Sequence, residues 1–249
     1  SAEVDNIYAD NLGVTPGDSV VLIGQPLAIE LAIYGGFPGQ AYLRCEQSEN
    51  GKKHEVVERM RQTSADESGK DHMVRYYQHY VADVKNSFRY RVSCGSALTR
   101  FYTVTAVPIP AYKSLEITST FPAYTGIAPR TNAVDDMEIN AVAGTEVAIR
   151  IVPERPLNSK LILADATRPA ILDAKGNASW SFAMTDKTAG QWSIEMTDSY
   201  GFTNKPASFP IRLVKDQSPT IEIETPEKLS YTLPPFAKLP FSYVATDDF

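Results

Sequence analysis

The chain has 249 residues, of which 43% are hydrophobic and 22% are charged. This composition supports packed cores and excludes a disordered chain, and the length suits two sandwich domains with residues to spare. The net charge of −6 repels a phosphate backbone and no Lys/Arg cluster offsets it, so nucleic acid is excluded as a partner. No run approaches the roughly 20 apolar residues of a membrane span, so no membrane insertion is expected of this segment.

Alternating apolar and polar residues predict β-strands through the first hundred residues. The segment 53–62 is ambiguous, because Val56, Val57 and Met60 have helical spacing although an edge strand would also fit. A proline-rich joint at 107–112 ends this unit. The expected strands cover 27–33, 40–47, 73–83, 87–94 and 98–107.

A second unit follows the first joint. Trp180 and Trp192 each share a strand face with apolar neighbours, so both are predicted to lie in its core. A further joint at 215–219 leads into a third unit that stops in mid-hairpin at Phe249, and the chain is therefore expected to be a fragment of a longer protein. The expected strands of the second unit cover 114–120, 137–142, 147–152, 160–164, 170–173, 178–184, 191–197 and 207–214.

The units resemble each other internally. Residues 24–31 and 144–151 share a glycine turn followed by an alternating strand, and residues 88–95 match 192–201 in pattern. About seven short strands per hundred residues are typical of a sandwich, and no βαβ unit is present. The predicted fold class is all-β: tandem immunoglobulin-like β-sandwiches, two complete plus the start of a third. The predicted domains are 1–107, 108–216 and the truncated 217–249.

The chain has two cysteines, Cys45 and Cys94. Each lies on the apolar face of its predicted strand, so both are expected to point inward. One cysteine pair in a β-rich chain is a candidate inter-strand disulfide, and the alternative is two buried free thiols that behave as small hydrophobic residues.

Five short motifs follow one another in a fixed order. They are Thr120–Gly126 (with P-A-Y-T-G), Ala143–Val147, Gln191–Gly201, Asp216–Pro219 and Val244–Phe249. Together they resemble a family of large, membrane-anchored bacterial proteins whose extracytoplasmic part carries tandem immunoglobulin-like repeats. There, P-A-Y-T-G is a linker and D-x-x-P a joint. The resemblance covers roughly 106–249, and the first unit loosely. It implies a place in the periplasm or at the cell surface and a membrane-anchored parent protein, and it brings no activity with it.

Histidine is scarce, which limits catalytic and metal sites. If segments 53–62 and 73–83 formed a hairpin, His54 and His79 would lie diagonally opposite, with His72 and Asp71 as conceivable further ligands. Surface histidines on an edge hairpin are the preferred alternative. No G-x-S-x-G and no glycine-rich phosphate loop occurs in the sequence, so neither an enzyme nor a cofactor is predicted.

Two binding hypotheses have some support. Asp216, Asp247 and Asp248 could gather at the second joint as calcium ligands, although a D-x-D-x-D loop is missing. Tyr76, Tyr77 and Tyr80 put aromatic rings on both faces of one strand, so at least one ring is expected at the surface, where it could bind a glycan.

The predicted function is a non-catalytic extracytoplasmic structural and interaction module, a spacer and protein-docking segment of a larger membrane-anchored protein. The alternative is a glycan-binding β-sandwich module. The expected partner is a protein or, under the alternative, a glycan. The sequence leaves the oligomeric state open.

Overall fold

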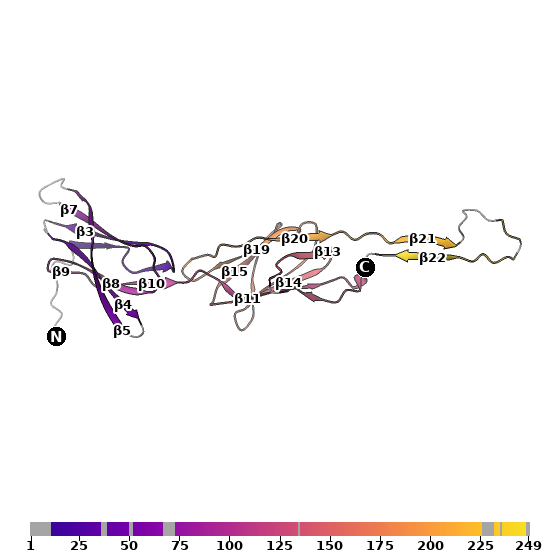
Figure 1. The fold of residues 1–249 in the computed structure, drawn as a ribbon, viewed down its shortest axis with the longest axis horizontal. Helices are drawn as coiled ribbons and strands as arrows, with labels where there is room; N and C mark the ends of the chain where they lie inside the picture. The colour runs from indigo at the N-terminus through magenta and orange to yellow at the C-terminus, as the bar shows by residue number, and fades with distance from the viewer. Residues whose placement is uncertain are drawn as a thin grey trace. The chain divides into compact units, whose positions relative to one another are not determined.

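The computed structural model describes residues 11–35, 39–49, 52–66, 73–133, 135–225, 232–234 and 236–247. These residues form strands joined by short turns, and the chain divides into two compact units, Ser1–Ile109 and Pro110–Phe249 (Figure 1). The division falls within the proline-rich segment 107–112, two residues beyond the predicted end of the first domain.

The first unit is a sandwich of two sheets. One sheet has the strand order β1-β3-β7-β6, and the other has the order β2-β10-β8-β4-β5 with the short β9 beside β8. Neighbouring strands are antiparallel except for β2 and β10, which are parallel. The strands are β1 Leu12–Thr15, β2 Ser19–Leu22, β3 Leu27–Tyr34, β4 Ala41–Glu49, β5 Lys52–Arg59, β6 Arg61–Asp66, β7 Val74–Val81, β8 Phe88–Cys94, β9 Ala97–Leu98 and β10 Tyr102–Val107.

The chain crosses from one sheet to the other at Met60. β5 pairs with β4, whereas β6 pairs with β7 of the opposite sheet. The Met60 N–H donates to the Ala41 carbonyl at 2.9 Å, and Gln40 Nε2 donates to the Met60 carbonyl at 2.8 Å. Both backbone groups at the buried crossing are therefore satisfied.

This crossing settles two expectations. The ambiguous segment 53–62 is extended, with β5 at the edge of its sheet. The hairpin that would have placed His54 opposite His79 is wrong, because β5 and β7 belong to different sheets and β7 pairs with β3 and β6. His72 and Asp71 lie outside the described residues.

The core of the first unit is formed by the inward faces of both sheets. Tyr90, at its centre, is fully buried, and its hydroxyl donates to the Gly17 carbonyl at 3.1 Å. The inward orientation predicted for the cysteines is confirmed, because Cys94 lies within this core and Cys45 packs against it.

The predicted disulfide is not formed: both cysteines are free. Cys45 stands opposite Tyr90 and Cys94 opposite Ala41, so the two lie four positions apart along neighbouring strands. At about 3.3 Å per residue this offset is about 13 Å, beyond the roughly 7 Å limit for the Cα atoms of a bridged pair.

The second unit is also a sandwich of two sheets, with strand orders β12-β11-β14-β18-β17 and β13-β20-β19-β15-β16. Here too the first strand of the second sheet, β13, runs parallel to its neighbour β20. The strands are β11 Tyr112–Thr120, β12 Arg130–Thr131, β13 Ile139–Val142, β14 Glu146–Pro153, β15 Asn158–Ile162, β16 Thr167–Pro169, β17 Ile171–Leu172, β18 Ala178–Ala183, β19 Gly190–Thr197 and β20 Phe209–Val214.

The two units share one topology. Ala170 separates β16 from β17 as Met60 separates β5 from β6, and its N–H donates to the Ser159 carbonyl at 3.0 Å. The glycine turns that begin the matching strands β3 and β14 contain Gly24 and Gly144, with φ of 86° and 81°, where glycine is favoured. The internal repeat and the predicted immunoglobulin-like sandwich are therefore confirmed for both units.

The second core contains both tryptophans, as predicted. The side chains of Trp180 and Trp192 are 4% and 1% exposed. Each indole N–H is satisfied by a backbone carbonyl, Arg168 for Trp180 at 3.1 Å and Met137 for Trp192 at 3.0 Å. These bonds let large aromatic rings fill the core without a buried unpaired donor.

Two of the sequence motifs form hydrogen-bonded turns within the second unit. The P-A-Y-T-G motif is a loop between β11 and β12, and not a linker between units. There the Thr125 hydroxyl donates to the Pro122 carbonyl at 2.8 Å. In the turn after β19, at the end of the motif 191–201, Asp198 Oδ1 accepts from the N–H groups of Tyr200 and Phe202 at 2.9 and 3.0 Å. Arg155 donates to Asp198 Oδ2 at 2.9 Å.

Beyond β20, β21 Thr220–Thr225 pairs antiparallel with β22 Ser242–Thr246. The two complete units contain the same pairing, β1 with β3 and β11 with β14. A third unit beginning at 217 stays a prediction that this pairing favours. Among the described residues, no helix has the length and apolarity needed to cross a membrane.

We expect Asp198 to make the second unit sensitive to acid. Burial of the carboxylate acts to raise its pKa, but hydrogen bonds from Phe202, Arg155 and Tyr200 outweigh burial and hold the pKa below 3.8. A lowered folded-state pKa stabilises the fold above the unfolded value, and this stability is lost as the pH falls below about 4. Asp198→Asn should lower the free energy of unfolding at pH 7 by about 2 kcal/mol and flatten its fall with acid, measured by urea denaturation.

The exposed Asp186 supplies the control. Asp186→Asn should leave both the free energy of unfolding at pH 7 and its pH dependence unchanged. Equal acid sensitivity in wild type and Asp198→Asn would contradict the role given to Asp198.

Candidate functional site

The first unit has a cavity at the end of β7, beside the edge strand β5. Its volume is about 410 Å³. Its walls are the inner face of β4 and β5, the end of β7 and the loop that leads to β8. The lining residues are Cys45, Val56, Glu58, His79, Tyr80, Val81, Asp83, Val84, Lys85, Asn86, Ser87 and Phe88.

Polar groups gather at this cavity. His79 Nε2 lies 2.9 Å from Glu58 Oε2, and Lys85 Nζ lies 3.8 Å from Asp83 Oδ2. Each carboxylate is about half exposed, so both are accessible to a further donor. Sequence reasoning missed Glu58 as a neighbour of His79, because their contact depends on the crossing at Met60.

The thiol of Cys45 faces the same cavity. Burial, followed by the nearby Glu58 carboxylate, raises the pKa of Cys45 to about 11. Because thiolates are the nucleophilic and metal-binding form, this thiol is protonated and unreactive at neutral pH. Among the described residues, no three His, Cys, Asp or Glu side chains are placed to hold a metal ion.

The second unit fills the equivalent space with its own side chains. Ile29 pairs with His79 in the first unit, and Ile149, five residues after the matching glycine, pairs with Trp180 in the second. Cys45 pairs with Val56, and Leu161 occupies the matching place and pairs with Arg168. Trp180 and Arg168 therefore stand where the first unit has His79 and Val56.

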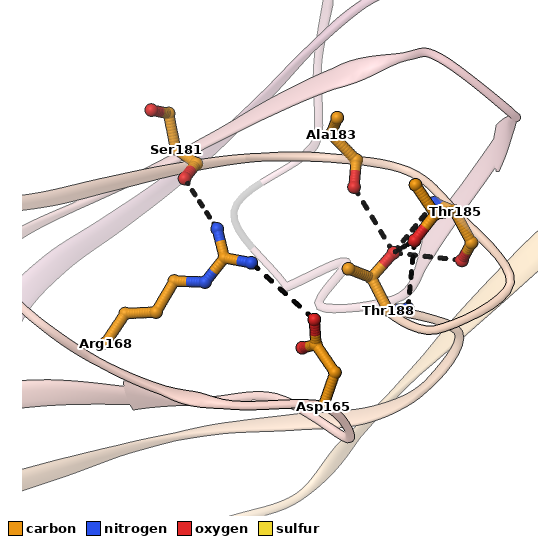
Figure 2. A network of polar contacts seen from close by, with 6 residues as sticks. All are labelled: Asp165, Arg168, Ser181, Ala183, Thr185 and Thr188. Carbon is orange, nitrogen blue, oxygen red and sulfur yellow. Dashed lines mark hydrogen bonds and ion pairs between the residues drawn. The ribbon is translucent and has the colours of Figure 1, made fainter.

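Arg168 is held firmly in that position. Figure 2 shows its guanidinium between Asp165 and Ser181: Nη2 lies 3.8 Å from the carboxylate, and Nη1 donates to the Ser181 carbonyl at 3.2 Å. The guanidinium carbon also lies 5.8 Å from the centre of the Phe182 ring. Arg168 belongs to β16, the edge strand of one sheet, and Ser181 belongs to β18 of the other, so the hydrogen bond between them links the two sheets.

The neighbouring threonines close the turn after β18. Thr188 Oγ1 donates to the Ala183 carbonyl at 3.3 Å and accepts from the Thr185 N–H at 2.9 Å (Figure 2). Local bonds of this kind fix the backbone of a turn. In the second unit the contacts of this region therefore stabilise the fold.

A separate candidate lies on the outer face of the sheet β1-β3-β7-β6. Tyr76 and Tyr80 are 42% and 60% exposed there, whereas Tyr77 points inward, is 4% exposed and donates to the Gly39 carbonyl at 3.0 Å. The sequence predicts at least one exposed ring, and two of the three, Tyr76 and Tyr80, are exposed. Tyr77 is a core residue.

Small neighbours leave these rings exposed. Tyr76 pairs with Ala32 and Tyr80 with Ala28, so no large side chain covers either ring from β3. Tyr34, which sequence reasoning missed, adds a third ring at 49% exposure on the same strand face as the alanines. We call Tyr34, Tyr76 and Tyr80 the tyrosine face.

Hydrogen-bonding groups lie between the rings. Gln78 stands between Tyr76 and Tyr80 on β7, and its Nε2 donates to Glu30 Oε1 at 3.2 Å. Arg61 pairs with Gln78 from the other side. A shallow groove on this face is lined by Glu30, Thr63, Ser64, Tyr76, Tyr77 and Gln78.

The calcium hypothesis gains no support from the described residues. Asp216 and Asp247 are exposed, and Asp248 lies outside the part of the chain that the structure describes. No acidic cluster able to hold a cation occurs among the residues that are described.

We expect Cys45 to react slowly with thiol reagents. A pKa of about 11 against the ordinary 9.0 leaves about 100-fold less thiolate at pH 8. Alkylation with iodoacetamide, followed by mass spectrometry of the Cys45 peptide, should therefore be about 100-fold slower than for a free cysteine. The rate should keep rising up to about pH 11.

The same protein unfolded in guanidinium is the control, where both cysteines should alkylate rapidly without prior reduction. A disulfide-linked peptide in the non-reduced protein, or fast alkylation of folded Cys45 at pH 8, would contradict the structure.

No family model matches the chain, and no curated protein matches it. Among solved structures, the chain is similar to fibronectin(III)-like modules of Clostridium thermocellum CbhA, at 8% identity and a TM-score of 0.36, covering 81% of this chain and 93% of that one. It is also similar to DIP-gamma IG1+IG2, at 6% identity and a TM-score of 0.31, covering 82% of this chain and 97% of that one. Both similarities concern the fold alone.

Proposed function

We propose that the chain is a non-catalytic structural and interaction module, a spacer and protein-docking segment of a larger extracytoplasmic protein anchored in a membrane. The observation that carries this proposal is the repetition of one topology: each sandwich closes its own core, so units can be joined in series. The protonated state of the Cys45 thiol agrees with a site that binds and does not react.

The location outside the cytoplasm follows the family resemblance and does not depend on a disulfide. Free cysteines occur in any compartment when they are buried and protonated, because the reactive thiolate is scarce. The raised pKa values of Cys45 and Cys94, caused first by burial, are compatible with an oxidising environment.

A second function, glycan binding, is favoured by the tyrosine face. Exposed rings beside alanines form flat apolar surfaces on which the C–H groups of a sugar ring can stack. Glu30, Gln78 and Arg61 supply planar groups that can bond to neighbouring hydroxyls. The combination of stacking surfaces and bidentate polar groups suits an extended polysaccharide.

A docking module should be cross-linkable to a partner protein. We expect a photo-reactive amino acid at one or more of Val57, Tyr80 and Ile171, all exposed, to yield a discrete protein adduct when the parent protein is irradiated in its own cells. The adduct is detected by a mass shift on gels and identified by mass spectrometry.

Irradiated wild type and unirradiated variants should show no shift. Absence of a protein adduct at all three positions would count against docking. A parent protein inaccessible to external protease after removal of the outer envelope would refute the proposed location.

The glycan function is tested by affinity electrophoresis in gels that contain neutral β-glucan, xylan or mannan. We expect retardation by at least one polysaccharide, and its loss in Tyr76→Ala and Tyr80→Ala. The matched control is Tyr124→Ala, which removes an exposed tyrosine of the second unit. Unretarded wild type in every gel would exclude this function for the three probes.

A further inference from the structure

Among the strands that the structure describes, β5 is a long edge strand with no neighbour on one side, unlike its short counterpart in the second unit. β5 has eight residues, whereas β16 has three and ends at Pro169. Natural edge strands are blunted by short length and by proline, since exposed backbone groups pair readily with another strand. The short strand and proline of the second unit therefore limit pairing at this edge. In the first unit, the backbone groups of β5 are available to another strand.

The hydrogen-bond pattern shows which backbone groups β5 presents. The Met60 N–H bonds to Ala41, and in an antiparallel ladder such bonded positions alternate. Positions 58 and 56 therefore bond to β4. The N–H and C=O groups of Glu55, Val57 and Arg59 point toward the open edge.

A strand added at this edge would extend rows of side chains that already reach the cavity. Tyr90, Cys45 and Val56 form one row across β8, β4 and β5. Because paired residues share a face, the residue opposite Val56 on an added strand would face the cavity. The edge and the cavity are thus parts of one surface.

The second unit indicates what fits in this space. There, the equivalent position holds the Arg168 guanidinium, bound to a carboxylate and near an aromatic ring. The cavity of the first unit offers the Glu58 carboxylate and the ring of Phe88, whereas its Asp83 carboxylate pairs with Lys85. No arginine is among its lining residues. An arginine from outside would complete the arrangement that the second unit builds internally.

We propose that the first unit captures an extended peptide of a partner protein, which pairs with the open edge of β5 and inserts an arginine side chain into the cavity. This inference rests on the proposed docking function and names the partner's chemistry. His79 engages Glu58 Oε2, and Glu58 Oε1 accepts from the guanidinium. The Glu58 carboxylate, about half exposed, supplies the negative charge that attracts the arginine side chain.

The test uses the whole 249-residue chain and a fluorescent, end-blocked peptide Thr-Val-Thr-Arg-Thr-Val-Thr, with binding followed by fluorescence anisotropy. We expect saturable binding, at least tenfold weaker for the same peptide with glutamate in place of arginine. Glu58→Gln should weaken the arginine peptide severalfold and reduce its preference over the glutamate peptide.

Backbone pairing is tested at Val57, whose N–H points to the open edge. Val57→Pro removes that donor without breaking the bonds to β4, and should weaken binding at least tenfold. Val57→Thr keeps the donor and should bind like wild type. Independently of any variant, the peptide should slow amide hydrogen exchange at 55, 57 and 59.

Three outcomes would overturn the proposal: equal binding of the two peptides, wild-type binding by a folded Val57→Pro protein, or no slowing of exchange at the β5 amides. Concentration-dependent protection of these amides without peptide would identify a second copy of the chain as the occupant instead. Protein adducts at Tyr80 or Ile171 together with a failed peptide test would refute this inference alone and leave the docking function intact.

Discussion

Where a strand leaves one sheet of a sandwich for the other, its buried backbone N–H and C=O groups must find new hydrogen-bond partners. At Met60 the crossing is buried, and its N–H and C=O would be costly without partners. Ala41 and Gln40 supply them, so β5 and β6 can belong to different sheets although only Met60 separates them. That single crossing makes β5 an edge, brings Glu58 to His79 and defines one wall of the cavity.

The second unit has larger side chains at the same crossing. Trp180 is larger than His79 and donates to Arg168, whose guanidinium reaches across to the other sheet. Trp180 in place of His79 and Arg168 in place of Val56 thus distinguish the edge of the second sandwich from the open edge of the first. Because the topology is common to both units, the difference lies in side chains, which is where function on a shared fold is found.

The sequence predicts what repeats locally and misses what depends on pairing. Alternation identified most of the strands, although not β1, β2, β6, β12 or β16. It also predicted the core positions of Trp180, Trp192 and Cys94, since a strand's buried face follows from its own residues. The disulfide was wrong because inward orientation does not give register, and register places the cysteines four positions apart. The exposure of Tyr76 depended on Ala32, a neighbour 44 positions away that only the sheet order reveals.

The position of β5 at the edge of its sheet also explains why the hydrophobic pattern of 53–62 fits both a helix and a strand. A central strand is buried on one face and alternates cleanly, but β5 has Val56 and Val57 exposed on opposite faces and Met60 buried at the crossing. Apolar residues on both faces of an edge are unfavourable for a chain that stays alone in solution, because they invite pairing. The second unit avoids them with a three-residue edge that ends in proline. The ambiguity of the pattern and the open edge therefore have one cause: β5 carries apolar side chains that its own sheet does not cover.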